Sequence, residues 1–76
     1  MHVRSAADDI KMVEGWGYTR GEALELVTRR AVFEARRVAD EARITPDREV
    51  LERHLAYLDE LRALCLAAVG PSRAVG

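Results

Sequence analysis

The chain has 76 residues, of which 49% are hydrophobic and 33% charged, and its 12 basic residues nearly balance 13 acidic ones. This composition excludes a disordered chain, and the formal net charge of −1 excludes the clearly basic domain that binds nucleic acid through charge alone. One cysteine excludes an internal disulfide framework and fits a reducing compartment.

The sequence also bears on where the protein is located in the cell and on the kind of genome that encodes it. No charged segment followed by an apolar one stands at the start, so we expect no signal peptide. The longest strongly apolar stretch, residues 61–69, contains Arg62 and is shorter than the about 20 residues of a membrane span. Eleven arginines and twelve alanines are typical of a GC-rich genome, such as that of an actinobacterium or its phages. We therefore expect a cytoplasmic, phage-like protein with no membrane contact.

The first predicted helix covers residues 5–14. Ser5 and Asp8 have the spacing of a capping box, in which the hydroxyl accepts from a first-turn amide and the acid reaches back. Gly15 is expected to end this helix, because glycine tolerates the left-handed conformation found after a last turn. The residues expected to face inward are Ile10 and Val13, flanked by Ala6 or Met12.

Trp16 lies in the following turn with a glycine on each side. We expect its indole to fold back and bury most of its apolar surface. The alternative is an exposed tryptophan that contacts a partner. In the first case it would cover Ile10, Val13 and either Leu24 or Leu26.

The second predicted helix covers residues 19–43. Thr19 and Glu22 form another capping-box pattern at its start. Apolar residues then recur every three or four positions, which is the period of one helix face. That face consists of Leu24, Val27, Ala31, Ala35, Val38 and Ala42.

The third predicted helix covers residues 46–69. Thr45 is the expected cap, and Pro46 suits the first helical position because its missing N–H costs nothing there. Gly70 followed by Pro71 is a stop signal. Its apolar face consists of Leu51, Leu55, Leu58, Cys65 and Val69, beside Leu61 and Leu64.

These elements predict an all-α, three-helix domain over residues 1–70, followed by a tail over 71–76. The short link at Ile44 and Thr45 makes the two long helices an antiparallel hairpin. The first helix is about 15 Å long at 1.5 Å per residue, and so it can cover only the half of the hairpin that holds Leu24 and Leu26.

The other half of the hairpin is the predicted partner site. Leu26 and Phe33 lie seven residues apart, opposite the alanine-rich face, so the second helix is apolar on two sides. The alternative is that the first helix covers Leu26 while Phe33 stays partly exposed. We expect a protein partner, with a homodimer first, at a surface of Phe33, Arg37, Val50, His54 and Tyr57.

Catalytic, metal and cofactor sites are not expected. His54 and Cys65 are eleven residues apart on one helix, whereas zinc ligands on a helix are three or four apart. Cys65 lies in an apolar run that favours an unreactive thiol. His54 could pair with Glu60, but a packed or rim histidine is the simpler interpretation. The chain is therefore expected not to be an enzyme.

Arginines follow two edges of the second helix, with glutamates four residues away at Glu25–Arg29, Arg30–Glu34 and Arg37–Glu41. An ion-paired, solvated face explains this pattern. The alternative is an edge that contacts phosphate, because arginine binds phosphate in bidentate fashion.

One segment favours that alternative. Residues 17–24, Gly-Tyr-Thr-Arg-Gly-Glu-Ala-Leu, resemble the turn into the second helix of ribbon-helix-helix DNA-binding proteins. The resemblance implies an obligate dimer in which residues 1–4 end the strand that enters the major groove, while the amides of residues 19–21 contact phosphate. The residues that would contact nucleic acid are Val3, Arg4, Thr19, Arg20, Arg29 and Arg36.

The preferred hypothesis is a small, non-enzymatic protein-interaction module that presents helix faces to itself or to a partner protein. A phage or accessory regulator and a small component of an assembly both fit this description. A ribbon-helix-helix-like transcriptional regulator is the alternative, although residues 46–69 have no counterpart in that minimal fold.

Overall fold

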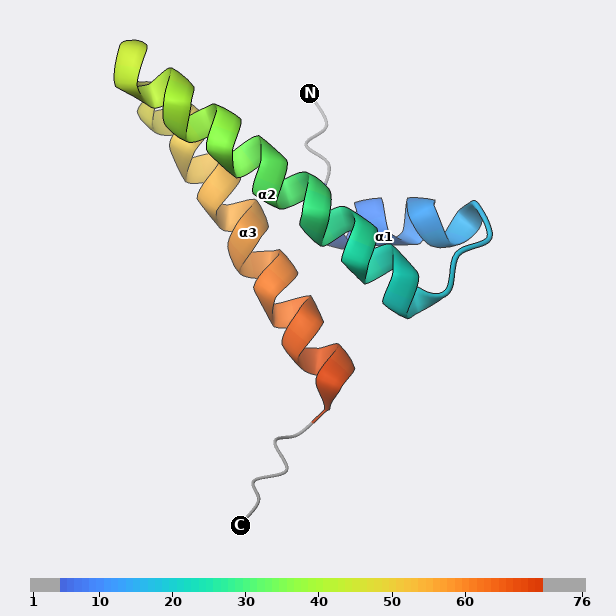
Figure 1. Ribbon diagram of the computed structural model, residues 1–76. Coiled ribbons are helices and arrows are strands. Elements are labelled where there is room, and N and C mark those ends of the chain that lie inside the picture. The colour runs from blue at the N-terminus through green and yellow to red at the C-terminus, as the bar shows by residue number, and fades with distance from the viewer. Residues whose placement is uncertain (1–4, 71–76) are drawn as a thin grey trace.

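A computed structural model describes residues 5–70 of the chain, and residues 1–4 and 71–76 lie outside the description. The described residues form three helices: α1 (Ala6–Gly15), α2 (Arg20–Ile44) and α3 (Arg48–Val69) (Figure 1). This part of the chain contains no strand, so the all-α prediction is confirmed. The predicted tail over 71–76 lies outside the described residues.

Both predicted capping boxes form. The Ser5 hydroxyl accepts from the Asp8 amide at 3.1 Å, and the Asp8 carboxylate accepts from the Ser5 amide at 3.3 Å. Thr19 and Glu22 make the same reciprocal pair at 3.1 and 2.9 Å. The side chains thus satisfy first-turn amides that have no partner within their own helix.

Two predicted helix boundaries are wrong. Gly15 stays within α1, and Gly17 is the glycine with positive φ, at 105°, that redirects the chain. α3 begins at Arg48 with Asp47 as its cap, rather than at Pro46 with Thr45, which instead ends α2. The Asp47 carboxylate accepts from two first-turn amides, whereas a threonine hydroxyl accepts less strongly.

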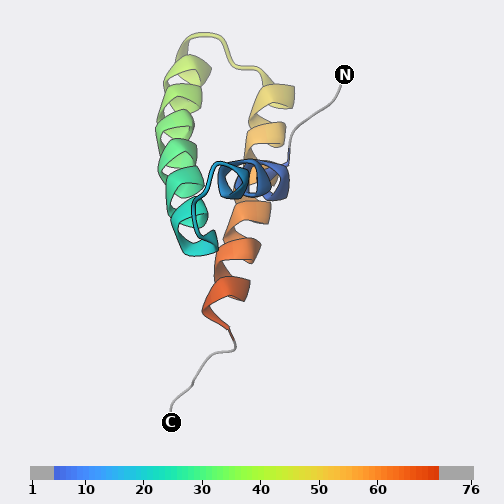
Figure 2. The ribbon, with the colours of Figure 1, turned by 90° about the vertical axis from the view of Figure 1, so that its right-hand side faces the viewer.

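The long helices α2 and α3 form a hairpin whose arms cross at an angle (Figure 1). α1 lies across one side of this hairpin and packs on both arms, about midway along them (Figure 2). The last turns of α3 extend beyond the start of α2 in both views. The closed end of the hairpin, where α2 connects to α3, is not covered by α1, as the lengths of the helices predict.

The buried core lies where the three helices meet. α1 and α2 supply most of its buried residues, and α3 supplies one, Leu61. The predicted inward faces of α1 and of the first half of α2 are confirmed. The core consists of Ala6, Ile10, Val13, Ala23, Leu24, Val27, Ala31 and Leu61.

The predicted inward face of α3 is wrong in part. Leu55 is 61% exposed, and Val69 is more exposed still, whereas Leu61 is buried. α1 packs against the side of α3 that carries Tyr57 and Glu60, which turns Leu61 toward the core. Leu55 is therefore on the edge that α1 does not reach.

The expected burial of Trp16 is also wrong, since its side chain is 65% exposed. The buried residues of α1 are Ala6, Ile10 and Val13, and the next position of that face is Gly17. Trp16 is the residue before it, and so lies about a quarter turn away, on the same edge as Met12. The indole thus lies beside the core rather than over it.

Candidate protein-interaction surface

A groove of about 330 Å³ lies between α2 and α3, on the part of the hairpin toward its closed end. It brings together four of the five residues that the sequence predicts to bind a partner: Arg37, Val50, His54 and Tyr57. The rest of its lining is Arg30, Ala31, Glu34, Val38 and Arg53. The groove therefore offers arginine, histidine and aromatic groups around an apolar lining.

Arg37 is held on the surface of α2 by two carboxylates. Its guanidinium donates to Glu34 at 2.9 Å and lies 3.7 Å from Glu41. The hydrogen bond from Arg37 lowers the pKa of Glu34, and the same bond raises the pKa of Arg37. The predicted pair of Arg30 with Glu34 is wrong, because Arg37 occupies that carboxylate instead. The predicted Glu25–Arg29 and Arg37–Glu41 pairs are confirmed.

Tyr57 connects the groove to α1. Its hydroxyl donates to Asp9 Oδ2 at 2.5 Å. Burial, followed by this hydrogen bond to a carboxylate, raises the pKa of Tyr57. One turn earlier on α3, His54 Nε2 is buried and has no hydrogen-bond partner among residues 5–70. Glu60 does not pair with His54, because its carboxylate accepts from α1 amides.

Phe33, the fifth predicted residue, does not line the groove. Successive residues of a helix are 100° apart, so Phe33 faces outward when Glu34 faces the groove. It belongs to a series spaced by four, three, four, three and four residues along the side of α2 that borders the groove, which two of its members, Arg30 and Arg37, also line. This outer face of α2 consists of Leu26, Arg30, Phe33, Arg37, Asp40 and Ile44.

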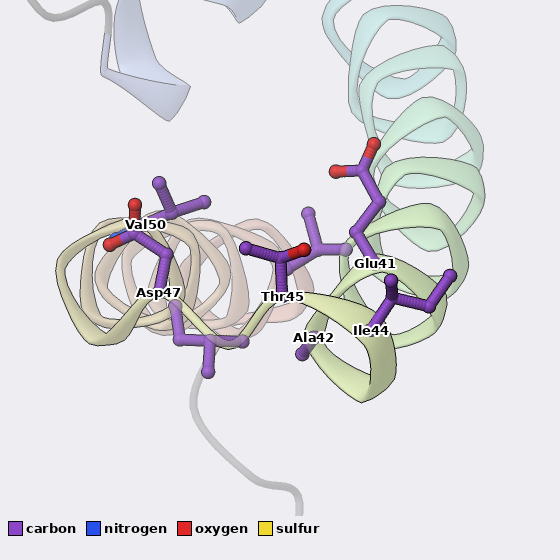
Figure 3. Close-up of a pocket in the computed structure, with 8 residues that line it drawn as sticks. Glu41, Ala42, Ile44, Thr45, Asp47 and Val50 are labelled. Carbon is purple, nitrogen blue, oxygen red and sulfur yellow. The ribbon is translucent and has the colours of Figure 1, made fainter.

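The apolar members of the outer face are exposed to different extents. Leu26 is 39% exposed, Phe33 66% and Ile44 83%. Ile44 is one of the residues that line the cleft at the closed end of the hairpin, and its side chain is directed away from Asp47 and Val50 (Figure 3). Ile44 is not among the residues that the sequence predicts to bind a partner, although the alternating spacing of four and three residues that runs from Leu26 through Phe33 reaches it.

The cleft at the closed end of the hairpin has a volume of about 410 Å³. It opens where the two arms separate before the connection, and Thr45 lies between them (Figure 3). Val38 and Ala42 of α2 face Leu51 of α3 here, and all three are only partly buried. The closed end is therefore loosely packed compared with the core under α1.

The residues of the DNA-binding alternative are spread out. Val3 and Arg4 lie outside the described residues. Thr19 is engaged as a cap, and Arg20 lies 3.5 Å from Glu14. Arg29 pairs with Glu25 at 2.6 Å, and Arg36 is exposed one turn beyond Phe33 on the adjoining side of α2.

Other chemistry is not assembled in the part of the chain that the structure describes. No group of three His, Cys, Asp or Glu side chains there could hold a metal ion. Cys65 is partly buried, with its sulfur 3.7 Å from the Thr28 hydroxyl. No helix among residues 5–70 is long and apolar enough to cross a membrane. Comparison with protein-family models, curated proteins and solved structures gives no match.

Proposed function

We propose that this protein is a non-enzymatic protein-interaction module that works by self-association through α2. The observation that carries the proposal is the exposure of large apolar side chains on the outer face of a helix whose other side is already buried. Phe33 is two-thirds exposed there, midway along α2. Apolar surface grouped in this way on a small domain is typical of a protein interface.

The groups around Phe33 support a protein partner. Arg37 lies next to it, and Tyr57 and His54 line the neighbouring groove. Arginine and aromatic residues are enriched at the centres of protein interfaces. A homodimer is the simplest assembly, because a two-fold axis lets one surface cover itself.

Nucleic acid is the less favoured partner. Three arginines of α2, namely Arg29, Arg37 and Arg43, already pair with carboxylates of the same helix. A phosphate would have to displace those acids, and the net charge of the chain is −1. The ion-paired interpretation of these edges therefore has more support than a phosphate-binding edge.

The test is the oligomeric state of the wild type and of two matched variants. We expect the wild type to dimerise at micromolar concentration in sedimentation equilibrium. Phe33→Asp should raise the dissociation constant about a hundredfold, because it places a charge at the centre of the interface. Val32→Asp makes a similar change at a half-exposed residue on another side of α2 and should leave the constant unchanged.

Two outcomes would overturn this proposal. A wild type that stays monomeric at about 100 μM, well above a micromolar dissociation constant, would exclude self-association. A dimer that Phe33→Asp leaves intact would place the interface elsewhere. Binding to random DNA with steep salt dependence would instead support the regulator hypothesis.

A further inference from the structure

The outer face of α2 has the spacing of a helix–helix seam. Its six positions alternate by four and three residues, the 3.5-residue repeat that keeps one side of a helix against a partner helix. In order, they are apolar, basic, aromatic, basic, acidic and apolar. The series runs from Leu26 through Arg30, Phe33, Arg37 and Asp40 to Ile44.

This series is complementary to itself when it is reversed. In an antiparallel pair of α2 helices the first position faces the last, the second faces the fifth and the third faces the fourth. Leu26 then meets Ile44, and Arg30 meets Asp40 with opposite charge. Phe33 meets Arg37, an aromatic face against a guanidinium. Each pairing occurs twice because the arrangement is symmetric.

We infer that the partner surface is a second copy of this chain, bound through α2 in this antiparallel register about a two-fold axis level with residue 35. The inference rests on the proposed self-association and specifies its geometry. In this register every position i of the outer face lies opposite position 70 minus i of the partner. Charge complementarity selects the register, because a parallel alignment would place Arg30 and Arg37 against themselves.

The ends of α2 support the same register. A hollow of about 270 Å³ lies between α1 and α2, lined by Leu26 together with Met12, Trp16 and Tyr18. Ile44, the most exposed large apolar residue of α2, lines the cleft at the closed end, and its side chain is directed away from Asp47 and Val50 (Figure 3). The antiparallel register brings the partner's Ile44 to Leu26, at this hollow. The exposure of Trp16 then has a physical role, because its indole helps to cover the partner's isoleucine.

The charged pairs are also available for an intermolecular contact. Within residues 5–70, four arginines of α2 form ion pairs, namely Arg20, Arg29, Arg37 and Arg43, whereas Arg30 forms none. Among the described residues Asp40 pairs with Arg43 alone, at 3.3 Å between exposed side chains. Such exposed pairs contribute little to stability. Arg30, which forms no ion pair within residues 5–70, and Asp40, whose ion pair is weak, are therefore the two residues that face each other in this register.

A mixed cysteine experiment tests the register directly. Cys65→Ala provides the background, and Leu26→Cys and Ile44→Cys are made in it separately. The two positions are 18 residues apart, or about 27 Å along the helix at 1.5 Å per residue. Neither variant alone can then form a disulfide with its own copy, which needs Cα atoms within about 7 Å. Mixing the two under mild oxidation should give a covalent heterodimer by mass spectrometry.

Charge reversal provides an independent test. Arg30→Asp and Asp40→Arg should each raise the dimer dissociation constant about tenfold, since each places two like-charged pairs in the interface. Combining both substitutions in one chain restores both pairs, so the constant should return to within about threefold of the wild type. Arg62→Asp on α3 makes the same charge change away from α2 and should have no effect.

The outcomes separate the register from self-association itself. A wild type that remains monomeric would overturn both proposals. A dimer in which the mixed cysteines do not react and the double charge variant is no tighter than the single variants would overturn the register alone. Efficient disulfides within either single-cysteine variant would indicate a parallel arrangement and would also overturn it.

Discussion

Tyr57 is the side chain that ties the candidate surface to the core. It lines the groove, and its hydroxyl donates to Asp9 on α1. A hydrogen bond to a carboxylate is stronger than one between neutral groups. The bond therefore fixes both the ring beside the groove and the position at which α1 crosses α3.

Replacing Tyr57 with phenylalanine should lower the free energy of unfolding by about 1–2 kcal/mol, because the donor to Asp9 is lost while the ring remains. Urea denaturation followed by circular dichroism measures the difference. Tyr18→Phe removes a hydroxyl from the turn after α1 and should change stability by less than about 0.5 kcal/mol. Equal effects of the two substitutions would contradict a special role for the Tyr57–Asp9 bond.

The contribution of Tyr57 should depend on pH. The raised pKa of Tyr57 means that the folded protein keeps the phenol proton when the unfolded chain loses it, above about pH 10. Its stabilising effect is then complete below about pH 10 and declines as the pH rises further. The stability difference between wild type and Tyr57→Phe should therefore be smaller at about pH 11 than at pH 8. A difference that stays constant or grows would contradict this assignment.

At the scale of the helices, α1 is held at its start by a contact with α3. The Glu60 carboxylate accepts from the amides of Ala6 and Ala7 at 3.0 and 3.3 Å, so α3 supplies an acidic group at the start of α1. Negative charge at this point also interacts favourably with the positive end of the helix dipole. α1 is only 10 residues long and would be marginal as an isolated helix.

Glu60→Ala should therefore destabilise α1 more than the hairpin. We expect a loss of about 1–2 kcal/mol, because two first-turn amides lose a charged acceptor. Hydrogen exchange measures the effect by segment, and α1 amides should lose more protection than those of α2. Glu52→Ala, whose carboxylate pairs with the exposed Arg48, is the matched control and should change neither. Equal loss of protection in α1 and α2 would contradict a local role for Glu60.

At the scale of the whole molecule, stability depends on a small core that is confined to the part of the hairpin under α1. The fully buried residues gather under α1, while the closed end of the hairpin keeps a cleft and partly buried side chains. A domain of 76 residues has roughly 4–11 kcal/mol of stability at typical values per residue. Loss of one core side chain thus removes a large fraction of the total.

Ile10→Ala should cost about 3 kcal/mol or more, because Ile10 is fully buried and the cavity cannot collapse easily. Leu55→Ala deletes the same number of carbons from a residue that is mostly exposed and should cost less than about 1 kcal/mol. Thermal unfolding of both variants at one protein concentration gives the comparison, since dimerisation makes the midpoint depend on concentration. Similar losses would mean that the core extends to the outer edge of α3.

The sequence determined the local structure of this protein. Capping boxes at Ser5 and Thr19 and a continuous helical period are properties of neighbouring residues, so the three helices follow from short segments. The sequence also grouped Arg37, Val50, His54 and Tyr57, because the hairpin brings their helix turns together.

The tertiary structure decided which residues of each helix are buried or paired, because this depends on the angle at which α1 crosses the hairpin. That angle turns Leu61 inward and leaves Leu55 exposed, places Glu60 at the start of α1, and leaves Trp16 uncovered. A helical period gives a face but not the direction in which a neighbouring helix approaches it, because that direction depends on packing between residues far apart in the chain. The separation of Phe33 from the groove depends instead on how α2 packs against α3, because Glu34 lines the groove and Phe33 lies 100° from it around the helix.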